Sequence, residues 1–346
     1  MGRVTVKTLA ATLGVSPATV SNAYNRPDQL SAELRERILA VAAELGFTGP
    51  DAAGRALRTG RSGAVGVLLT GHLSYAFSDP YAVAMLAGLA STVERTTSIV
   101  LLPLPRDEHG EPDLSVIRSA SIDALALLSL SDGHPAAELA RARGIGLVTT
   151  HRVDDPDASW VAIDDRRTGV LVAEHLAGLG HTDVLVVAPT IDDPDDAEVR
   201  LVDPPRIGYA DYAARLAGIS DTLGGRVSMV TSGVNDFDSG LRAAAWLLAQ
   251  DRLPTAVVAL SDVLALGVLE GLTSAGVDVP GTVSVCGFDD IAAAAPRGLT
   301  TVRQPITERG REIGRMLLDP TDPPRQVLMD VELVVRTSSG PARTSA

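Results

Sequence analysis

The 346-residue sequence is poor in lysine, cysteine and aromatic residues, and it has no long apolar run. Lys7 is its only lysine, which excludes the lysine-containing phosphate loop of nucleotide hydrolases. A single cysteine, Cys286, cannot form an internal disulfide, and its setting VSVCGF favours a buried packing residue over a catalytic one. No apolar stretch approaches the roughly 20 residues of a membrane span, and the N-terminus is too polar for a secretory signal. We therefore expect a cytoplasmic protein with no membrane partner.

The signatures of bound cofactors and metals are also missing. No G-x-G-x-x-G follows a predicted strand, so no nucleotide cofactor is expected. The stretch EHLAGLGH lacks the H-E-x-x-H spacing of a zinc site and is better explained as a helix and its terminating turn. The acidic run DDPDD at 192–196 lacks the spacing of a calcium loop and is typical of a solvated loop. We predict that the protein has no cofactor and no metal site.

Charge is distributed unevenly along the chain. The net charge is −13, which for a uniform chain would argue against nucleic acid as a partner. Residues 1–61, however, contain eight basic and five acidic residues, a net charge of +3, so the remainder carries −16. A basic head on an acidic body is the asymmetry expected of a DNA-binding module attached to a larger sensor.

The head shows the pattern of a helix-turn-helix. Apolar residues recur at helical spacing up to Leu13, and Gly14 permits a sharp turn. Ser16 can cap a second helix, Pro17 suits its first turn, and Val15 and Val20 stand at the two positions of a hydrophobic staple. Val20 and Tyr24 then face the first helix, which leaves an opposite stripe for DNA composed of Pro17, Ala18, Ser21, Asn22 and Asn25. A third helix beginning at Ser31 covers the pair with Leu34, Ile38, Val41, Ala42 and Leu45.

Residues 61–346 alternate short apolar runs with amphipathic stretches. Strands are expected at VGVLL, IVLLPL, ALALLSL and GLVTTH, and then at VLVVA, VSMVT, AVVAL and VSVCGF. Helices are expected near 81–97, 113–120, 135–143, 166–179, 206–218, 237–250 and 262–275. Such βα repeats predict an α/β protein with doubly wound parallel sheets, and two series predict two lobes. Polar residues at strand ends, where open parallel sheets bind ligands, include Ser261, Asp262, Asp289 and Asp290. For any one of these aspartates, a helix cap is at least as good an explanation as a ligand contact.

The head and its tether resemble one known family. The stretch TVKTLAATLGVSPATVSNAYN, followed by GFTGPDAAGRALRTG, is similar to the head of lactose-repressor (LacI/GalR) regulators. The resemblance implies a DNA-binding domain at 1–49 and a hinge helix at 50–60, in which Leu57 wedges into the minor groove beside Arg55. Asp51 and Gly54 depart from the family pattern. The DNA-binding residues we expect are Thr5, Ser16, Pro17, Ala18, Thr19, Ser21, Asn22, Asn25, Arg26, Arg55 and Leu57.

The resemblance continues through the body at 61–346. It implies a periplasmic-binding-protein-like fold for effector binding and dimerisation, with lobe 1 at about 61–164 and 303–328 and lobe 2 at about 165–302 and 329–346. It places effector-binding residues at His151, Arg206, Phe237, Ser261, Asp289 and Gln304. Family members often have Asn at position 261 and Asp near position 151, and both groups are used against sugar hydroxyls. Besides a sugar, a carboxylate, a nucleoside or another polar metabolite therefore remains open as the effector. Tyr75 and Phe77 are predicted cleft walls, with aromatic core packing as an equal alternative.

Together these features predict a transcription factor, usually a repressor in the family, that binds a pseudo-palindromic operator as a homodimer. The C-terminal RTSSGPARTSA has no leucine heptads for a tetramerisation helix. A solute-binding protein for transport would share the body but would need export, and it would have no use for the head. An enzyme is also disfavoured, because the motifs assemble no nucleophile, base and orienting residue.

Overall fold

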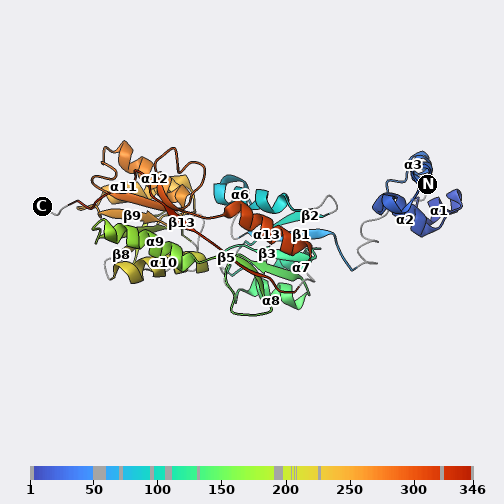
Figure 1. Ribbon diagram of the computed structural model, residues 1–346, viewed down its shortest axis with the longest axis horizontal. Helices are drawn as coiled ribbons and strands as arrows, with labels where there is room; N and C mark the ends of the chain where they lie inside the picture. Colours follow the sequence, from blue (N-terminus) through green and yellow to red (C-terminus); the bar gives the residue numbers. More distant parts are fainter. Residues whose placement is uncertain are drawn as a thin grey trace. The chain divides into compact units, whose positions relative to one another are not determined.

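The computed structural model describes residues 4–49, 60–69, 73–93, 97–105, 111–130, 133–190, 198–203, 205, 207, 209–224, 227–319 and 323–343. The chain divides into two compact units, a head (Met1–Gly63) and a body (Ala64–Ala346) (Figure 1). The predicted hinge helix at 50–60 lies outside the described residues, apart from Gly60.

The head contains α1 (Val6–Leu13), α2 (Pro17–Asn25), the 3₁₀ turn η1 (Pro27–Gln29) and α3 (Ala32–Glu44). Hydroxyl groups cap the three α-helices, because the side chains of Thr5, Ser16 and Ser31 accept hydrogen bonds from backbone amides three residues ahead. Gly14 ends α1 with a φ of 67°, a left-handed conformation that glycine adopts without strain. The predicted order of three short helices is thus present.

The core of the head is small and apolar. Its buried members are Leu9, Ala10, Val20, Ala23, Ile38 and Ala42. Leu45, which we expected to cover this core, is 40% exposed, so that prediction is wrong. The reason is that α3 ends at Glu44 and the chain turns, so that Phe47 takes the inward place and packs edge-on against Tyr24 with ring centres 5.8 Å apart.

The first sheet of the body has the order β12-β5-β4-β3-β1-β2 among the described residues, and its strands are parallel. Its strands are β1 (Ala64–Leu69), β2 (Ser98–Pro103), β3 (Ala124–Leu127), β4 (Gly146–Thr149), β5 (Ser159–Ile163) and β12 (Gln326–Met329). The helices with this sheet are α5 (Tyr75–Ser78), α6 (Pro80–Ala90), α7 (Ser115–Ser119), α8 (Pro135–Ala142) and α13 (Ile306–Leu318). Side chains of α6 and α13 share one apolar core, and those of α7 and α8 share another, so the helices cover opposite faces (Figure 1).

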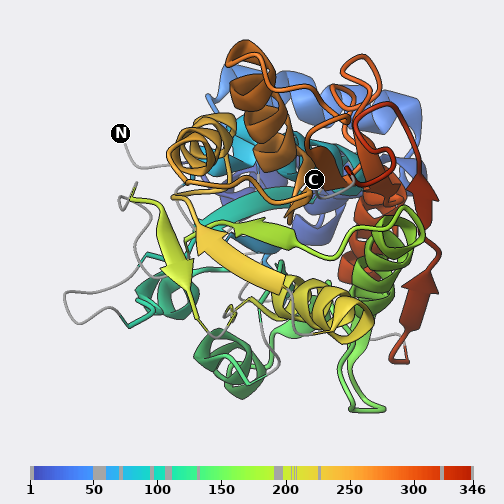
Figure 2. The same cartoon turned by 90° about the vertical axis from the view of Figure 1, so that its left-hand side faces the viewer.

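The second sheet has the order β13-β11-β10-β9-β6-β8-β7 among the described residues, with antiparallel strands only at its two edges. Its strands are β6 (Val184–Ala188), β7 (Arg200–Val202), β8 (Val227–Thr231), β9 (Ala256–Ala259), β10 (Ser284–Asp289), β11 (Thr300–Arg303) and β13 (Glu332–Val334). Helices α9 (Asp165–Gly178) and α10 (Ala210–Leu223) cover one face, and α11 (Phe237–Leu248) and α12 (Asp262–Ser274) cover the other. Figure 2 shows orange α11 and α12 on the side of the strands opposite to green α9 and yellow α10.

The chain crosses between the two sheets three times. The first crossing joins β5 to α9, the second joins β11 to α13, and the third joins β12 to β13. We call the two halves lobe 1, built on the first sheet, and lobe 2, built on the second. Residues at the crossings therefore stand at the boundary between the lobes.

Three pairs of helices pack at unusually short range through glycine. A Cβ atom added to Gly88 of α6 would lie 2.1 Å from the carbonyl oxygen of Thr307, and one added to Gly310 of α13 would lie 2.1 Å from that of Met85. The same reciprocal contact joins Gly169 and Gly218 of α9 and α10, and Gly240 and Gly267 of α11 and α12. Side chains larger than hydrogen do not fit at these points, so the glycines fix the spacing of the helices.

The structure also corrects the expected elements. Strands β5, β7, β11, β12 and β13 and helix α13 were not predicted, and the helix expected at 206–218 begins only at Ala210. The unpredicted strands are mostly short and lie near an edge or a crossing, where apolar patterning is weak. Among the helices that the structure describes, none has the length and apolar character needed to cross a membrane.

Candidate functional site

The outer face of α2 is small and uncharged. Pro17 and Ala18, in its first turn, are exposed, and Asn22 one turn later is half-buried. The cap fixes the start of the helix, because Ser16 Oγ accepts from Thr19 N at 3.0 Å and lies 2.8 Å from Thr19 Oγ1. This face offers methyl and methylene groups, which suit a thymine methyl, and the carboxamides of Asn22 and the exposed Asn25, which suit an adenine edge.

Ser21 does not belong to this face, and the prediction that it is exposed is wrong. It is only 9% exposed, and Asn25 Nδ2 donates to its carbonyl oxygen at 3.0 Å and lies 3.3 Å from its Oγ. Fewer residues of α2 are therefore exposed on this face than the helical spacing predicted.

The remaining predicted DNA contacts are distributed over the head. Thr5 and Ser16 cap helices, and Arg26 is exposed directly after α2. Sequence reasoning missed Gln29, whose Oε1 accepts a hydrogen bond from Asn22 Nδ2 at 3.2 Å. Arg55 and Leu57 lie outside the described residues.

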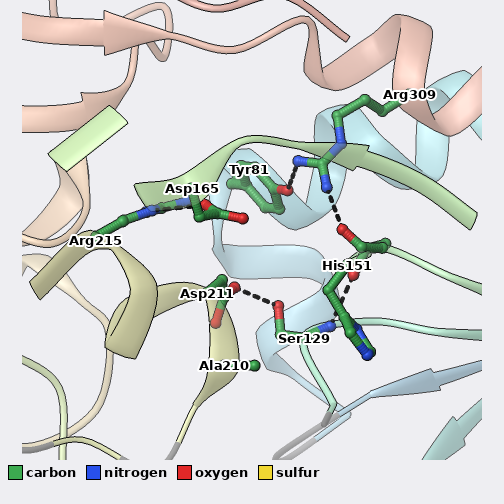
Figure 3. A pocket seen from close by; sticks show the side chains of 9 residues that line it. Tyr81, Ser129, His151, Asp165, Ala210, Asp211, Arg215 and Arg309 are labelled. Atoms are coloured by element: carbon green, nitrogen blue, oxygen red, sulfur yellow. Dashed lines mark hydrogen bonds and ion pairs between the residues drawn. The ribbon is translucent and has the colours of Figure 1, made fainter. Parts of the chain in front are cut away.

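A small pocket lies between the two lobes of the body (Figure 3). It is lined by Tyr81, Ser129, Thr150, His151, Asp165, Ala210, Asp211, Arg215 and Arg309. Several of these residues follow the carboxyl ends of parallel strands: Ser129 follows β3, Thr150 follows β4 and Asp165 follows β5. This is the edge at which open parallel sheets bind ligands.

Arg215 is the central cation on the lobe 2 side. Its Nε donates to Asp165 Oδ1 at 3.0 Å, its Nη1 donates to the carbonyl oxygen of Leu260 at 2.8 Å, and its Nη1 lies 3.9 Å from Asp289 Oδ1. The guanidinium also lies over the rings of Tyr212 and Phe288. Arg215 thus links Asp165, which directly follows the first crossing, to Asp289 at the end of β10.

Burial and charge act in opposite directions on these groups. Burial disfavours the charged form of Arg215, but the carboxylates of Asp165 and Asp289 outweigh it and raise the pKa of Arg215. Burial raises the pKa of Asp165 and raises that of Asp289 well above its ordinary value, although Arg215 opposes both shifts. The two carboxyl groups therefore depend on Arg215 to carry charge in this interior.

Arg309 has the corresponding place on the lobe 1 side and is 3% exposed. Its Nη1 donates to Tyr81 Oη at 2.8 Å and to Gln304 Oε1 at 3.1 Å, and its Nη2 donates to the carbonyl oxygen of Thr150 at 2.8 Å. Gln304 Nε2 in turn donates to Asp289 Oδ1 at 2.6 Å. A continuous series of polar contacts thus runs from lobe 1 through the second crossing to lobe 2.

Two further hydrogen bonds join the lobes directly. Ser129 Oγ donates to Asp211 Oδ2 at 2.9 Å, and Asn235 Nδ2 donates to Tyr75 Oη at 3.0 Å (Figure 3 shows the first). Ser129 and Asp289 have positive φ values of 56° and 118°. Such backbone conformations cost a non-glycine residue about 1 to 3 kcal/mol and cluster at functional sites.

The structure brings together only part of the predicted effector set. His151 lines the pocket, and Asp289 and Gln304 lie in the polar series beside it. Ser261 is buried, caps α12 and contacts Asn235 Oδ1 at 2.5 Å. Phe77 is 69% exposed and Phe237 is 37% exposed, and neither lines the pocket. Arg206 lies outside the described residues, and sequence reasoning missed Arg215, Arg309 and Asn235.

One buried carboxyl behind the site makes stability depend on pH. Asp262 Oδ1 accepts from Thr301 Oγ1 at 2.6 Å and its Oδ2 accepts from Ile291 N at 3.0 Å, while burial raises its pKa to about 7. Its folded form holds the proton more tightly than its unfolded form, so its contribution to stability is complete below about pH 4 and is lost as pH rises through 7.

We expect Asp262→Asn, which imitates the protonated side chain, to remove this dependence. Its free energy of unfolding should exceed that of the wild type by about 4 kcal/mol at pH 8, and this difference should shrink as pH falls toward 4. Urea unfolding followed by Trp246, which lies in the same lobe, in a Trp160→Phe background would measure this. Parallel pH curves for the two proteins would contradict the assignment.

Among the described residues, no group of three or more His, Cys, Asp or Glu side chains is arranged to hold a metal ion. What the pocket offers is instead a set of paired carboxylate, guanidinium, hydroxyl and amide groups. Such groups bind a polar molecule by hydrogen bonds.

Comparison with known proteins identifies both domains of the chain. Residues 5–49 match the family described as bacterial regulatory proteins, lacI family, and residues 173–339 match the periplasmic binding protein-like domain. An HTH-type transcriptional regulator of Mycolicibacterium smegmatis is 37% identical, over 98% of this chain and 97% of that protein. The ribose operon repressor of Escherichia coli is 28% identical, over 88% of this chain and 89% of its own length. The solved complex of the transcriptional regulator CelR with cellobiose is 27% identical, with a TM-score of 0.64 over 97% of this chain and 100% of that one.

Three observations support the same assignment. They are a helix-turn-helix head with a small outer face, a two-lobe body with a polar pocket at its crossings, and a relative similar over nearly its full length. The chain belongs to the LacI family of bacterial regulatory proteins and is a DNA-binding transcriptional regulator.

Proposed function

We propose that this regulator represses transcription by binding a pseudo-palindromic operator as a homodimer, and that a small polar effector in the interlobe pocket controls this binding. The observation that carries the proposal is the position of the pocket. Asp165 and Gln304 stand at two of the three crossings between lobes, and both belong to the polar series at the pocket. A ligand that contacts these residues can change the arrangement of one lobe relative to the other. Because its DNA target lies in the bacterial cytoplasm, the protein acts there.

The charge of the pocket favours an uncharged effector rich in hydroxyl groups. Asp165 and Asp211 balance Arg215 and Arg309 in the lining, and Asp289 adds a further carboxyl beside Arg215. Both guanidiniums already donate to protein acceptors. Among the described arginines of the lining, an anionic ligand would therefore meet no spare positive charge, whereas hydroxyl groups can donate to carboxylates and accept from N–H groups in turn. The bound cellobiose of CelR belongs to this chemical class.

The experiment that tests effector control is a melting-shift panel of neutral sugars and polyols, nucleosides, and organic acids on the full-length protein. We expect stabilisation by a neutral polyhydroxyl compound, and loss of that stabilisation in Asp211→Ala. Asp221→Ala provides the control, because Asp221 pairs with Arg166 at the exposed surface of lobe 2. Stabilisation by organic acids alone would contradict the proposed class.

DNA reading is proposed for the outer face of α2, with Pro17 and Ala18 against thymine methyl groups and Asn22 on adenine. Arg26 and other arginines of the head supply phosphate contacts, and Arg55 and Leu57 of the proposed hinge helix act in the minor groove.

We expect Asn22→Ala to relax base preference at one position of each half-site, at a cost of about 1 to 3 kcal/mol. Sites selected from randomised duplexes by wild type and variant measure this directly. The expected wild-type motif is two-fold symmetric, and an unchanged motif in the variant would refute the role of Asn22.

A further inference from the structure

We propose that Gln29 positions the carboxamide of Asn22, so that the choice of base at the Asn22 position is made by a coupled pair of amides. The inference rests on the proposed DNA-reading role of α2. Its starting observation is that Asn22 Nδ2 donates to Gln29 Oε1 at 3.2 Å on the surface of the head, although seven residues separate the two.

The backbone that carries Gln29 is held in place. Gln29 N donates to the carbonyl oxygen of Arg26 at 3.1 Å and Leu30 N donates to that of Pro27 at 3.3 Å, which closes the 3₁₀ turn η1. The next residue, Leu30, packs against the core of the head. Gln29 is thus an exposed side chain on a fixed turn.

The end of α2 is held as well. Arg26 N donates to the carbonyl oxygen of Asn22 at 2.8 Å, and Arg35 Nε of α3 donates to that of Ala23 at 3.2 Å. The backbone that carries Asn22 and the backbone that carries Gln29 are therefore both held by hydrogen bonds. The bond between the two side chains links α2 to the turn η1 beside the outer face of α2.

With Gln29 Oε1 as the acceptor, this hydrogen bond sets which way the Asn22 amide faces. A free carboxamide can turn by 180° and exchange its oxygen with its NH₂ group, which alters the base edge that it matches. With one N–H engaged by Gln29 Oε1, the second N–H and Oδ1 remain on one edge. That edge can donate to N7 of adenine and accept from its N6 amino group, so the pair favours adenine over bases that need the opposite order.

The inference predicts that Gln29 acts through Asn22 and not on a base of its own. We expect Gln29→Ala to lower the preference at the Asn22 position about 2- to 10-fold, the range of one net hydrogen bond. Gln29→Glu keeps an acceptor for Asn22 Nδ2, so it should retain that preference. Its added negative charge near phosphate should weaken total affinity at every sequence and make binding more sensitive to salt.

The test is selection from randomised duplexes with the full-length protein, comparing wild type, Gln29→Ala, Gln29→Glu, Asn22→Ala and the double alanine variant. Asp28→Ala, in the same turn, is the matched control and should leave base preferences unchanged. The position that Asn22→Ala relaxes identifies the base under study. At that position the double variant should behave like Asn22→Ala alone, because removing Gln29 has no further effect once Asn22 is absent.

Three results would overturn the inference while leaving DNA binding by the protein intact. These are an unchanged preference in Gln29→Ala, a change confined to a different position, and an additive loss in the double variant. Failure of the wild type to enrich any motif would overturn the proposed function together with the inference.

Discussion

Replacing Arg215 with Met is expected to lower the free energy of unfolding of lobe 2 by about 3 to 5 kcal/mol. The guanidinium holds Asp165 at 3.0 Å and lies 3.9 Å from Asp289, and all three side chains are buried. Removing one member of a buried ionic group leaves its partners desolvated without a counter-charge, which costs far more than the pair itself contributes. Guanidinium chloride unfolding followed by Trp246 fluorescence would measure the loss.

Two comparisons make the Arg215 result specific. Arg166→Met removes an exposed pair with Asp221, and its effect on the free energy of unfolding should stay below about 1 kcal/mol.

The second comparison is the pH dependence of Arg215→Met. Because burial already raises the pKa values of Asp165 and Asp289, both carboxyls should take up protons readily once Arg215 is gone. The deficit of Arg215→Met should therefore shrink as pH falls from 8 toward 5. An equal deficit at both pH values would contradict this explanation.

Gly310→Val is expected to cost about 3 kcal/mol or more, because a Cβ atom at this position would lie 2.1 Å from the backbone oxygen of Met85. A backbone atom of a packed helix cannot move aside as a flexible side chain can, so α6 and α13 must separate. Tyr81 stands on α6 and Arg309 on α13, joined by a hydrogen bond of 2.8 Å in the wall of the pocket. The substitution should thus weaken effector binding as well as folding.

The matched control for Gly310→Val is Gly178→Val in α9, where an added Cβ meets nothing within 4 Å. Its unfolding free energy should lie within about 0.5 kcal/mol of the wild type, since valine and glycine differ little in helix propensity. Thermal or chemical unfolding of both variants, with the melting shift by a stabilising sugar as a second readout, would decide. Equal stability of the two variants would show that the close contact between α6 and α13 at Gly310 does not contribute to the stability of the protein.

The sequence predicted the alternation of strands and helices because both faces of each sheet are covered and the inner strands that we predicted are apolar throughout. It did less well at element ends, because the helix that we expected at 206–218 begins at Ala210. Arg206 lies outside the described residues, so its role in effector binding remains a prediction. Arg215 stands inside α10, and helical spacing alone gives no sign of Asp165 and Asp289, which it meets in the interior.

Other parts of the site depend on contacts between distant segments. Ser261 was a sound prediction as a polar residue at a strand end, but its hydroxyl caps α12 and contacts Asn235. The pairing of Asn22 with Gln29 crosses from a helix to a turn, which no periodicity reports. The reciprocal glycines of α6 and α13 stand more than 200 residues apart in the chain. These features follow from tertiary packing, for which one sequence carries no local signal.

Control of DNA binding requires that an effector bind the two states of the protein with different affinity. The polar series from Arg309 through Gln304 and Asp289 to Arg215 spans both lobes and includes one of their crossings. A molecule that changes these contacts changes the free energy of one lobe arrangement relative to another. The same coupling must appear in both directions, because DNA then alters effector affinity by the same factor.

The most direct test is the affinity of the full-length protein for its selected operator, measured by fluorescence anisotropy at fixed salt with and without a sugar or polyol that stabilises it. We predict a change of about fivefold or more, together with an equal change in the affinity for that compound when operator is present. An operator affinity unaffected by a compound whose binding Asp211→Ala abolishes would contradict control through the interlobe pocket.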